Sequence, residues 1–202
     1  MWEDLSKYLP KFISSLVMNK KNQKRKGERY YQYTTSIPVA NALASSFSED
    51  VVNKCGLIIA DEMLRFGVDV ILSPSMNIVR NPLCGRNFEY YSEDPYLTSK
   101  LVSQFVNAVQ SNGVTKACIK HYLCNNQENN RFQSNSIVSI RTIREIYLRP
   151  FLNVISNSNP YSLMTSYNLV NGEHSSESSY FIKDVLGEEM NYCGLIMTDW
   201  IS

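Results

Sequence analysis

Residues 94–121, DPYLTSKLVSQFVNAVQSNGVTKACIKH, hold the helix and the strand from which the fold can be predicted. Asp94 and Pro95 suit the N-cap and the first position of a helix. Apolar residues then recur at helical spacing, and Gly113 is expected to end the helix. The apolar run 114–119 predicts a buried strand. This stretch therefore predicts one unit of an α/β protein.

Helices and short apolar strands alternate on both sides of this unit. The stretch 46–49 fits a capping box, and Gly67 is expected to end the helix that follows. The other predicted elements are strands at 68–72, 162–166 and 194–198, helices at 140–155 and 180–186, and a strand ending at 37–40. Such alternation is typical of parallel βα units.

Composition excludes several classes of protein. Hydrophobic residues make up 44% of the 202 residues and the net charge is +1, so nothing points to nucleic acid or a membrane surface as a partner. No apolar stretch is long enough to span a bilayer. The N-terminus lacks a small-residue cleavage site, so we expect no signal peptide. The compartment stays unknown, with the cytoplasm weakly favoured.

The cysteines and histidines argue against a metal site. The five cysteines are odd in number and lack paired metal spacing, which favours buried, reduced thiols. Two histidines beside 13 tyrosines disfavour zinc. We therefore predict no metal.

The basic run 19–29 marks a change in composition near the N-terminus. A solvated linker or tail is the favoured interpretation, and a nucleic-acid or localisation patch is the alternative. We place a boundary near residues 31–35, which divides the chain into a basic segment, 1–34, and a domain, 35–202.

Polar side chains follow the predicted strands, where the active face of a βα protein lies. These residues are Arg86 in the long loop after 68–72, Lys120 and His121 after 114–119, Tyr167 and Asn168 after 162–166, and Asp199 and Trp200 after 194–198. Such side chains can grip sugar hydroxyls, and Trp200 can stack on a sugar ring. Their common placement predicts a polar site for a polyhydroxylated ligand.

Asp199 is the predicted nucleophile, because a strand end would hold its carboxylate rigidly beside Trp200. A retaining glycosidase also needs an acid/base carboxyl group about 5–5.5 Å away. Glu93 and Asp94 are expected to cap a helix. Glu89 and Glu128 are expected to orient basic neighbours such as Arg86 and Arg131. The sequence therefore offers no convincing acid/base residue.

Five collinear motifs resemble the N-terminal barrel domain of glycoside hydrolase family 3, most closely its β-glucosidase members. They are GRNFEYYSEDPYLTSKLVSQFVNAVQ, IKHYLCNNQENNR, REIYLRPF, LMTSYNLVNGEHSSES and GLIMTDW, within residues 35–202. The resemblance implies a (β/α)8 TIM-type barrel. It also implies a retaining mechanism on β-linked glucosides or oligosaccharides, through a covalent glycosyl-enzyme intermediate and without metal or organic cofactor.

The resemblance also implies a role for each residue selected above. Asp199 matches the family's catalytic nucleophile. The substrate-binding positions are Arg86, Lys120, His121, Tyr167 and Trp200. The loop 122–126 departs from the hexosaminidase branch, whose own histidine loop it lacks, and so favours the glucosidase branch.

Three family features are missing from these 202 residues: the early Asp-Gly-Pro loop, several barrel strands, and the downstream domain that carries the acid/base glutamate. A closed barrel needs eight strands, and the sequence shows four clear ones, so we expect an incomplete (β/α)8 barrel. Two hypotheses follow. The first is a β-glucosidase-like hydrolase whose catalytic nucleophile is Asp199. Under either hypothesis, a complementary chain that supplies the missing barrel and acid/base domain is a candidate partner. The second is a catalytically incompetent fragment or sugar-binding remnant. A nucleotide-binding sheet is disfavoured, because no strand is followed by a glycine-rich turn.

Overall fold

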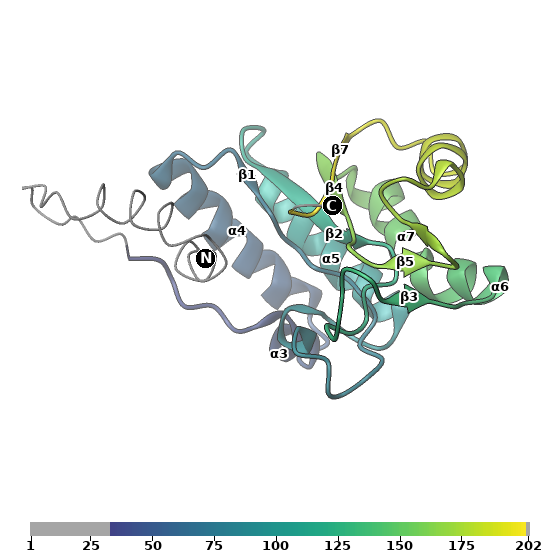
Figure 1. Cartoon of the computed structure of the whole chain (residues 1–202). Helices are drawn as coiled ribbons and strands as arrows, with labels where there is room; N and C mark the ends of the chain where they lie inside the picture. The colour runs from purple at the N-terminus through teal and green to yellow at the C-terminus, as the bar shows by residue number, and fades with distance from the viewer. Residues whose placement is uncertain (1–32, 201–202) are drawn as a thin grey trace, which may run out of the picture. The chain divides into compact units, whose positions relative to one another are not determined.

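The computed structural model describes residues 33–200, and a four-stranded parallel sheet forms their centre (Figure 1). In order across the sheet, the strands are β1 (Val70–Ile71), β2 (Lys116–Tyr122), β4 (Ser162–Thr165) and β7 (Leu195–Met197). The predicted α/β class with parallel strands is confirmed. The prediction that Lys120 and His121 follow a strand is wrong, because β2 continues through both.

Three long helices accompany the sheet (Figure 1). They are α4 (Glu49–Phe66), α5 (Pro95–Gln110) and α7 (Arg149–Ser158). Helix α5 contacts α4, α7 and β2. A Cβ atom at Gly56 of α4 would lie 2.7 Å from the Cβ atom of Ala108 in α5. Glycine at this position therefore permits the close approach of the two helices.

Helix α4 begins two residues later than the predicted capping box implies. Ser48 is the N-cap, and its side chain accepts a hydrogen bond from the backbone N–H of Val51. The Ser46 hydroxyl instead donates to the carbonyl of Leu43 and accepts from the backbone N–H of Ser48, before the helix begins. The predicted end at Gly67 is confirmed, since this glycine has a left-handed φ of 65°.

The strand predicted to end at residues 37–40 is wrong. The chain is irregular before Ala40, where the short helix α3 (Ala40–Ala44) begins. Pro38 has no N–H to give to a strand partner, whereas alanine and leucine in ANALA favour a helix.

The helix predicted over residues 140–155 is divided into three elements. These are α6 (Ile140–Thr142), the π-helical segment η2 (Ile143–Tyr147) and α7. Pro150 lies in the first turn of α7 and has no N–H to bond to the preceding turn. A regular helix therefore restarts at this proline.

A second, three-stranded sheet was not predicted. It contains β3 (Asn135–Ser136), β5 (Leu169–Val170) and β6 (Glu173–His174), in that order. The remaining elements are a 3-10 turn, η1 (Asn87–Glu89), and a π-helix, η3 (Tyr180–Glu189). Strands of two residues carry no hydrophobic alternation, so the sequence pattern does not reveal them.

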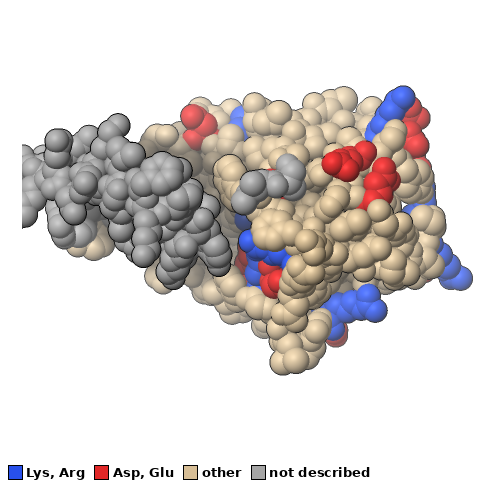
Figure 2. All heavy atoms as spheres, viewed as in Figure 1, with Lys and Arg blue, Asp and Glu red and all other residues tan. Residues whose placement is uncertain are grey.

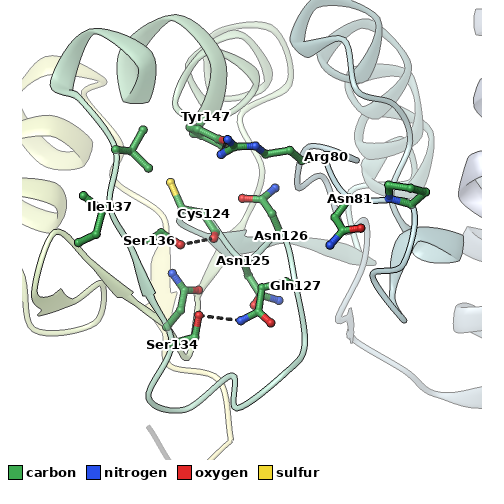
Figure 3. A pocket seen from close by; sticks show the side chains of 13 residues that line it. Arg80, Asn81, Cys124, Asn125, Asn126, Gln127, Ser134, Ser136, Ile137 and Tyr147 are labelled. Atoms are coloured by element: carbon green, nitrogen blue, oxygen red, sulfur yellow. Dashed lines mark hydrogen bonds between the residues drawn. The ribbon is translucent and has the colours of Figure 1, made fainter.

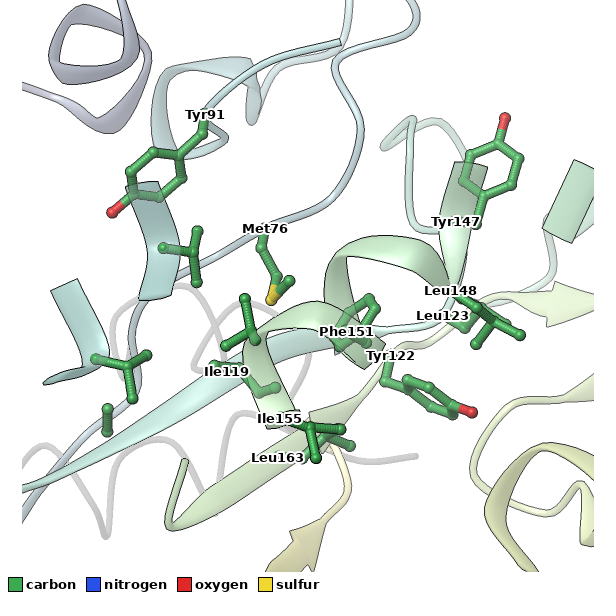
Figure 4. Packing of buried hydrophobic residues seen from close by; sticks show 14 of the residues in the cluster. Met76, Tyr91, Ile119, Tyr122, Leu123, Tyr147, Leu148, Phe151, Ile155 and Leu163 are labelled. Atoms are coloured by element: carbon green, nitrogen blue, oxygen red, sulfur yellow. The ribbon is translucent and has the colours of Figure 1, made fainter. Parts of the chain in front are cut away.

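The core lies between the central sheet and the helices (Figure 4). Ile119 of β2 and Leu163 of β4 are fully buried there. The ring of Tyr122 meets the ring of Phe151 from α7 edge to face, with centroids 5.2 Å apart. This packing fixes β2, the strand that carries Lys120 and His121, against α7.

Four of the five cysteines are buried thiols as predicted, whereas Cys193 is exposed. Within residues 33–200, no cluster of His, Cys, Asp and Glu side chains could hold a metal ion. No helix of the same residues is long and apolar enough to cross a membrane. Nearly all of the basic segment 1–34 lies outside the described residues, and the boundary at residue 35 stays a prediction.

Replacing Asp94 by alanine should lower the free energy of unfolding by about 1 kcal/mol. The Asp94 carboxylate caps α5 by accepting a hydrogen bond from the backbone N–H of Tyr96 at 2.8 Å, and alanine leaves that N–H without its partner. Urea denaturation measures the change. Glu93→Ala, which removes the neighbouring exposed carboxylate, is the control. Equal stability of the two variants would contradict a capping role.

Candidate active site

The predicted site residues converge because β2, β4 and β7 are parallel and adjacent. Lys120 and His121 lie near the carboxyl end of β2, Tyr167 lies two residues beyond β4, and Asp199 two residues beyond β7. Arg86 reaches the same place from the loop before η1, through contact with His121. The structure therefore brings these five residues to one edge of the sheet.

The Asp199 carboxylate is held at this edge with only 5% of the residue exposed. Its Oδ1 accepts a hydrogen bond from the backbone N–H of Trp200 at 2.8 Å. Its Oδ2 lies 3.7 Å from Nε2 of His121. Burial, together with the charge of Asp199 and a hydrogen bond to it, raises the pKa of Tyr167 to about 12. Tyr167 is therefore a neutral phenol that donates to the carboxylate.

Trp200 is 60% exposed, although it directly follows the buried carboxylate. An indole in this position offers an apolar surface to solvent beside Asp199. This placement is compatible with the predicted stacking on a sugar ring.

His121 is a buried, neutral imidazole. It is 1% exposed, and burial lowers its pKa well below the ordinary value, with further lowering by the charges of Arg86, Lys120 and Arg131. The Arg86 guanidinium donates from Nη2 to Nε2 of His121 at 2.8 Å. The imidazole therefore faces Asp199 without a compensating positive charge of its own.

Glu89 anchors Arg86 and lies near Lys120. Arg86 donates through Nε to Glu89, and Ser75 donates to the other carboxylate oxygen at 2.6 Å. Although burial alone would raise the pKa of Glu89, these hydrogen bonds and the positive charges hold it below its ordinary value. The Lys120 ammonium lies 3.9 Å from Glu89, and burial lowers the pKa of Lys120. The expectation that Glu89 orients Arg86 is confirmed.

Arg131 belongs to the same cluster, although it was not among the predicted site residues. It donates to Glu128 at 3.0 Å, which confirms the expected pairing. Its guanidinium carbon also lies 4.7 Å from the ring centroid of Tyr167 and 5.3 Å from that of Phe132. The sequence does place Arg131 in the polar stretch after β2. It does not show that Arg131 contacts Tyr167, which the loop after β4 contributes.

The charges of this cluster balance. Three basic side chains, Arg86, Lys120 and Arg131, accompany three carboxylates, Glu89, Glu128 and Asp199. On the face shown in Figure 2, basic and acidic atoms of the described residues likewise lie close to one another. A site without a large net charge suits a neutral, hydroxyl-rich ligand better than a phosphorylated one.

A cavity of about 370 Å³ lies beside the cluster (Figure 3). Amide and hydroxyl side chains line much of it, including Asn125, Asn126 and Ser136. Asn168 lines it, but the predicted nucleophile and the five predicted substrate-binding residues do not. Asn125 connects it to the cluster by donating to Glu128 at 3.1 Å. This cavity therefore borders the candidate site but is not the site itself.

The neutral His121 makes the stability of the fold depend on pH. Below about pH 6.5 the histidine of the unfolded chain binds a proton, whereas the buried His121 does not. Stability should therefore fall as the pH falls from 6.5 to 5.5, by up to about 1.4 kcal/mol for this group. Chemical denaturation at both values measures the change. His121→Gln should remove this dependence and His174→Gln should keep it, and the reverse result would contradict a neutral His121.

Comparisons with known proteins agree with this geometry. The family model for the glycosyl hydrolase family 3 N terminal domain matches residues 15–202. Thermostable beta-glucosidase B of Acetivibrio thermocellus is 43% identical over 166 residues, which are 82% of this chain and 22% of that protein. An exo-alpha-(1->6)-L-arabinopyranosidase of Bifidobacterium longum is 42% identical over the same shares of the two chains. The chain thus spans about a fifth of the length of these curated relatives.

A solved structure is similar over most of the chain. It is that of beta-glucosidase 3B from Thermotoga neapolitana in complex with glucose, with a TM-score of 0.84 and 47% sequence identity. The match covers 89% of this chain and 25% of that one. The similarity supports the α/β fold with the parallel sheet described above.

Proposed function

The chain belongs to glycoside hydrolase family 3, and from this membership and the site we propose that it supplies the nucleophile and sugar-binding part of a retaining β-glycosidase. The substrates we propose are β-linked glucosides. The observation that supports the proposal most strongly is the Asp199 carboxylate, buried at the end of β7 and held by the backbone N–H of Trp200. A fixed carboxylate is what a covalent glycosyl-enzyme intermediate requires.

In this proposal, an oxygen of Asp199 bonds to the anomeric carbon while the bond from that carbon to the leaving oxygen breaks. The neutral His121, 3.7 Å from Oδ2, does not neutralise the carboxylate as an imidazolium would. The phenol of Tyr167 donates to Asp199. The carboxylate is thus held in position for attack.

The remaining groups would bind the sugar. Arg86 and Lys120 present donors at one edge of the sheet, His121 holds Arg86 in place through Nε2, and Trp200 offers an exposed ring face. Because Glu89 and Glu128 together compensate Arg86 and Lys120, these groups can bind hydroxyls without requiring an anionic ligand. This arrangement favours a neutral glycoside as substrate.

The acid/base group is the part of the mechanism that we assign to residues outside the described cluster. Glu89 has a lowered pKa and is bonded to Arg86, so it is unsuited to donate a proton. Glu128 is paired with Arg131. General acid catalysis contributes about 10²–10⁴-fold, so we expect this chain alone to act only on glycosides whose leaving group needs no proton.

Covalent trapping tests the proposal. 2,4-Dinitrophenyl 2-deoxy-2-fluoro-β-D-glucoside should react once with the chain, because its leaving group departs unprotonated and the fluorine slows hydrolysis of the intermediate. Mass spectrometry of the intact chain and its peptides should find the fluoroglucosyl group on Asp199. Glucose titration by calorimetry, with Asp199→Ala beside it, gives a second measurement.

The outcomes separate the two hypotheses for this chain. Labelling of Asp199 supports a retaining glycosidase, and rapid hydrolysis of cellobiose would contradict the assignment of the acid/base group elsewhere. Glucose binding without any labelling would replace the proposal with the sugar-binding alternative. Labelling at another residue, or neither labelling nor binding, would overturn it.

A further inference from the structure

His121 is hydrogen-bonded on one side by Asn77 and on the other by Arg86, and the chemistry of each contact fixes which group donates. Asn77, in the loop after β1, makes three contacts with it. The side-chain amide of Asn77 donates to the carbonyl of His121 at 2.8 Å, and its Oδ1 accepts from the backbone N–H of His121 at 2.9 Å. The same Oδ1 lies 3.1 Å from the ring Nδ1. Both residues are buried.

These contacts determine which ring nitrogen carries the proton. The backbone carbonyl of His121 can only accept and its N–H can only donate, so the amide of Asn77 has one possible orientation. Its Oδ1 can then only accept from Nδ1, which must be protonated. On the other side of the ring, the Arg86 guanidinium can only donate, so Nε2 must be unprotonated. Both neighbours thus favour the same tautomer, and the backbone of His121 fixes the orientation of Asn77 alone.

We propose that Asn77 is a positioning residue that holds His121 as the Nδ1–H tautomer, so that the nitrogen facing Asp199 carries no proton. A proton on Nε2, which lies 3.7 Å from Oδ2 of Asp199, would attract the negative charge of that carboxylate and weaken it as a nucleophile. Arg86 instead uses the Nε2 lone pair. The catalytic role of this tautomer rests on the function proposed above, whereas the assignment of the tautomer does not.

Nitrogen NMR can test this directly, because the chain has only two histidines, His121 and His174. In chain labelled with ¹⁵N-histidine, protonated and unprotonated ring nitrogens have well-separated shifts. His174→Gln removes one ring and assigns the other. We expect His121 to show a protonated Nδ1 with a slowly exchanging proton and an unprotonated Nε2.

Asn77→Ala removes the acceptor from Nδ1. We expect the loss of the Nδ1-bound proton signal and movement of both ring nitrogens toward the averaged shifts of exchanging tautomers. Asn168→Ala is the matched control, since Asn168 is equally buried and donates to two backbone carbonyls but makes no contact with the imidazole. It should leave the His121 shifts unchanged.

Several results would overturn the proposal. The first is a protonated Nε2 in the unaltered chain. The second is unchanged ring shifts in Asn77→Ala, which would mean that Arg86 alone sets the tautomer. The third is an equal change of the ring shifts in Asn168→Ala. If Asn77→Ala does not fold, Asn77→Asp keeps an acceptor at Nδ1 and should keep that nitrogen protonated, and the opposite result overturns the proposal. The spectra are recorded without sugar, so failure of the chain to bind or react with a glucoside would refute the proposed function alone.

Discussion

Asp199→Gly is expected to lower the turnover of 2,4-dinitrophenyl β-D-glucoside by at least about 10⁴-fold, as the loss of a nucleophile does in other enzymes. The dinitrophenolate leaves without a proton, so the loss reports the nucleophile and not the acid/base group. Removing the side chain also opens the position between Trp200 and His121, where the carboxylate lay. Steady-state release of dinitrophenolate measures the change.

Sodium azide should restore part of this turnover. A small anion can enter the space left in Asp199→Gly and attack the anomeric carbon from the face that the carboxylate used. The expected product is therefore the α-glucosyl azide, with inverted configuration, which proton NMR identifies. Glu128→Gly, which removes a carboxylate of the same cluster but keeps Asp199, is the control and should give no α-glucosyl azide. Unchanged turnover in Asp199→Gly, or a β-azide, would contradict Asp199 as nucleophile.

The regular part of the fold could be predicted because its signals are local. The N-cap at Asp94 and the left-handed glycine at Gly67 lie beside the helices that they bound, and the strands are short apolar runs. The errors arose where a single residue changed the local hydrogen bonding of the backbone. The Ser46 hydroxyl bonds to the end of α3 instead of capping α4, and Pro150 divides a helix whose apolar spacing continues through it.

The sequence predicts where the candidate site residues lie better than it predicts what each of them does. Parallel strands bring their carboxyl ends together, so the sequence could place Lys120, Tyr167 and Asp199 at one edge of the sheet. It could not show that Asn77 hydrogen-bonds to His121, because the two are 44 residues apart. They meet because β1 pairs with β2 and Ser75 forms a bridge to Lys120. The protonation states in the site depend on such pairings.

Arg86→Met is expected to lower the free energy of unfolding by about 3 kcal/mol, because it leaves a largely buried carboxylate at Glu89 without its main partner. The two side chains are 18% and 23% exposed, and Glu89 would retain Ser75 and a distant Lys120. Arg144→Met is the matched control. Arg144 makes a bidentate ion pair with Glu189, but both side chains are more than 40% exposed, so the cost there should be about 1 kcal/mol or less.

The effect of the unpaired Glu89 charge on stability can be separated from the effect of lost packing. If the unpaired charge is responsible, adding Glu89→Gln to Arg86→Met should recover more than half of the lost stability, because the amide needs no cation. The deficit should also shrink as the pH falls toward 4. Without Arg86 the pKa of Glu89 is no longer held down, so the variant protonates this group while the unaltered fold still holds it ionised. Urea denaturation of the three chains at pH 7 and pH 4.5 decides the question. If neither Glu89→Gln nor low pH restores the lost stability, Arg86 stabilises the site by packing. The ion pair between Arg86 and Glu89 would then not be what stabilises the cluster.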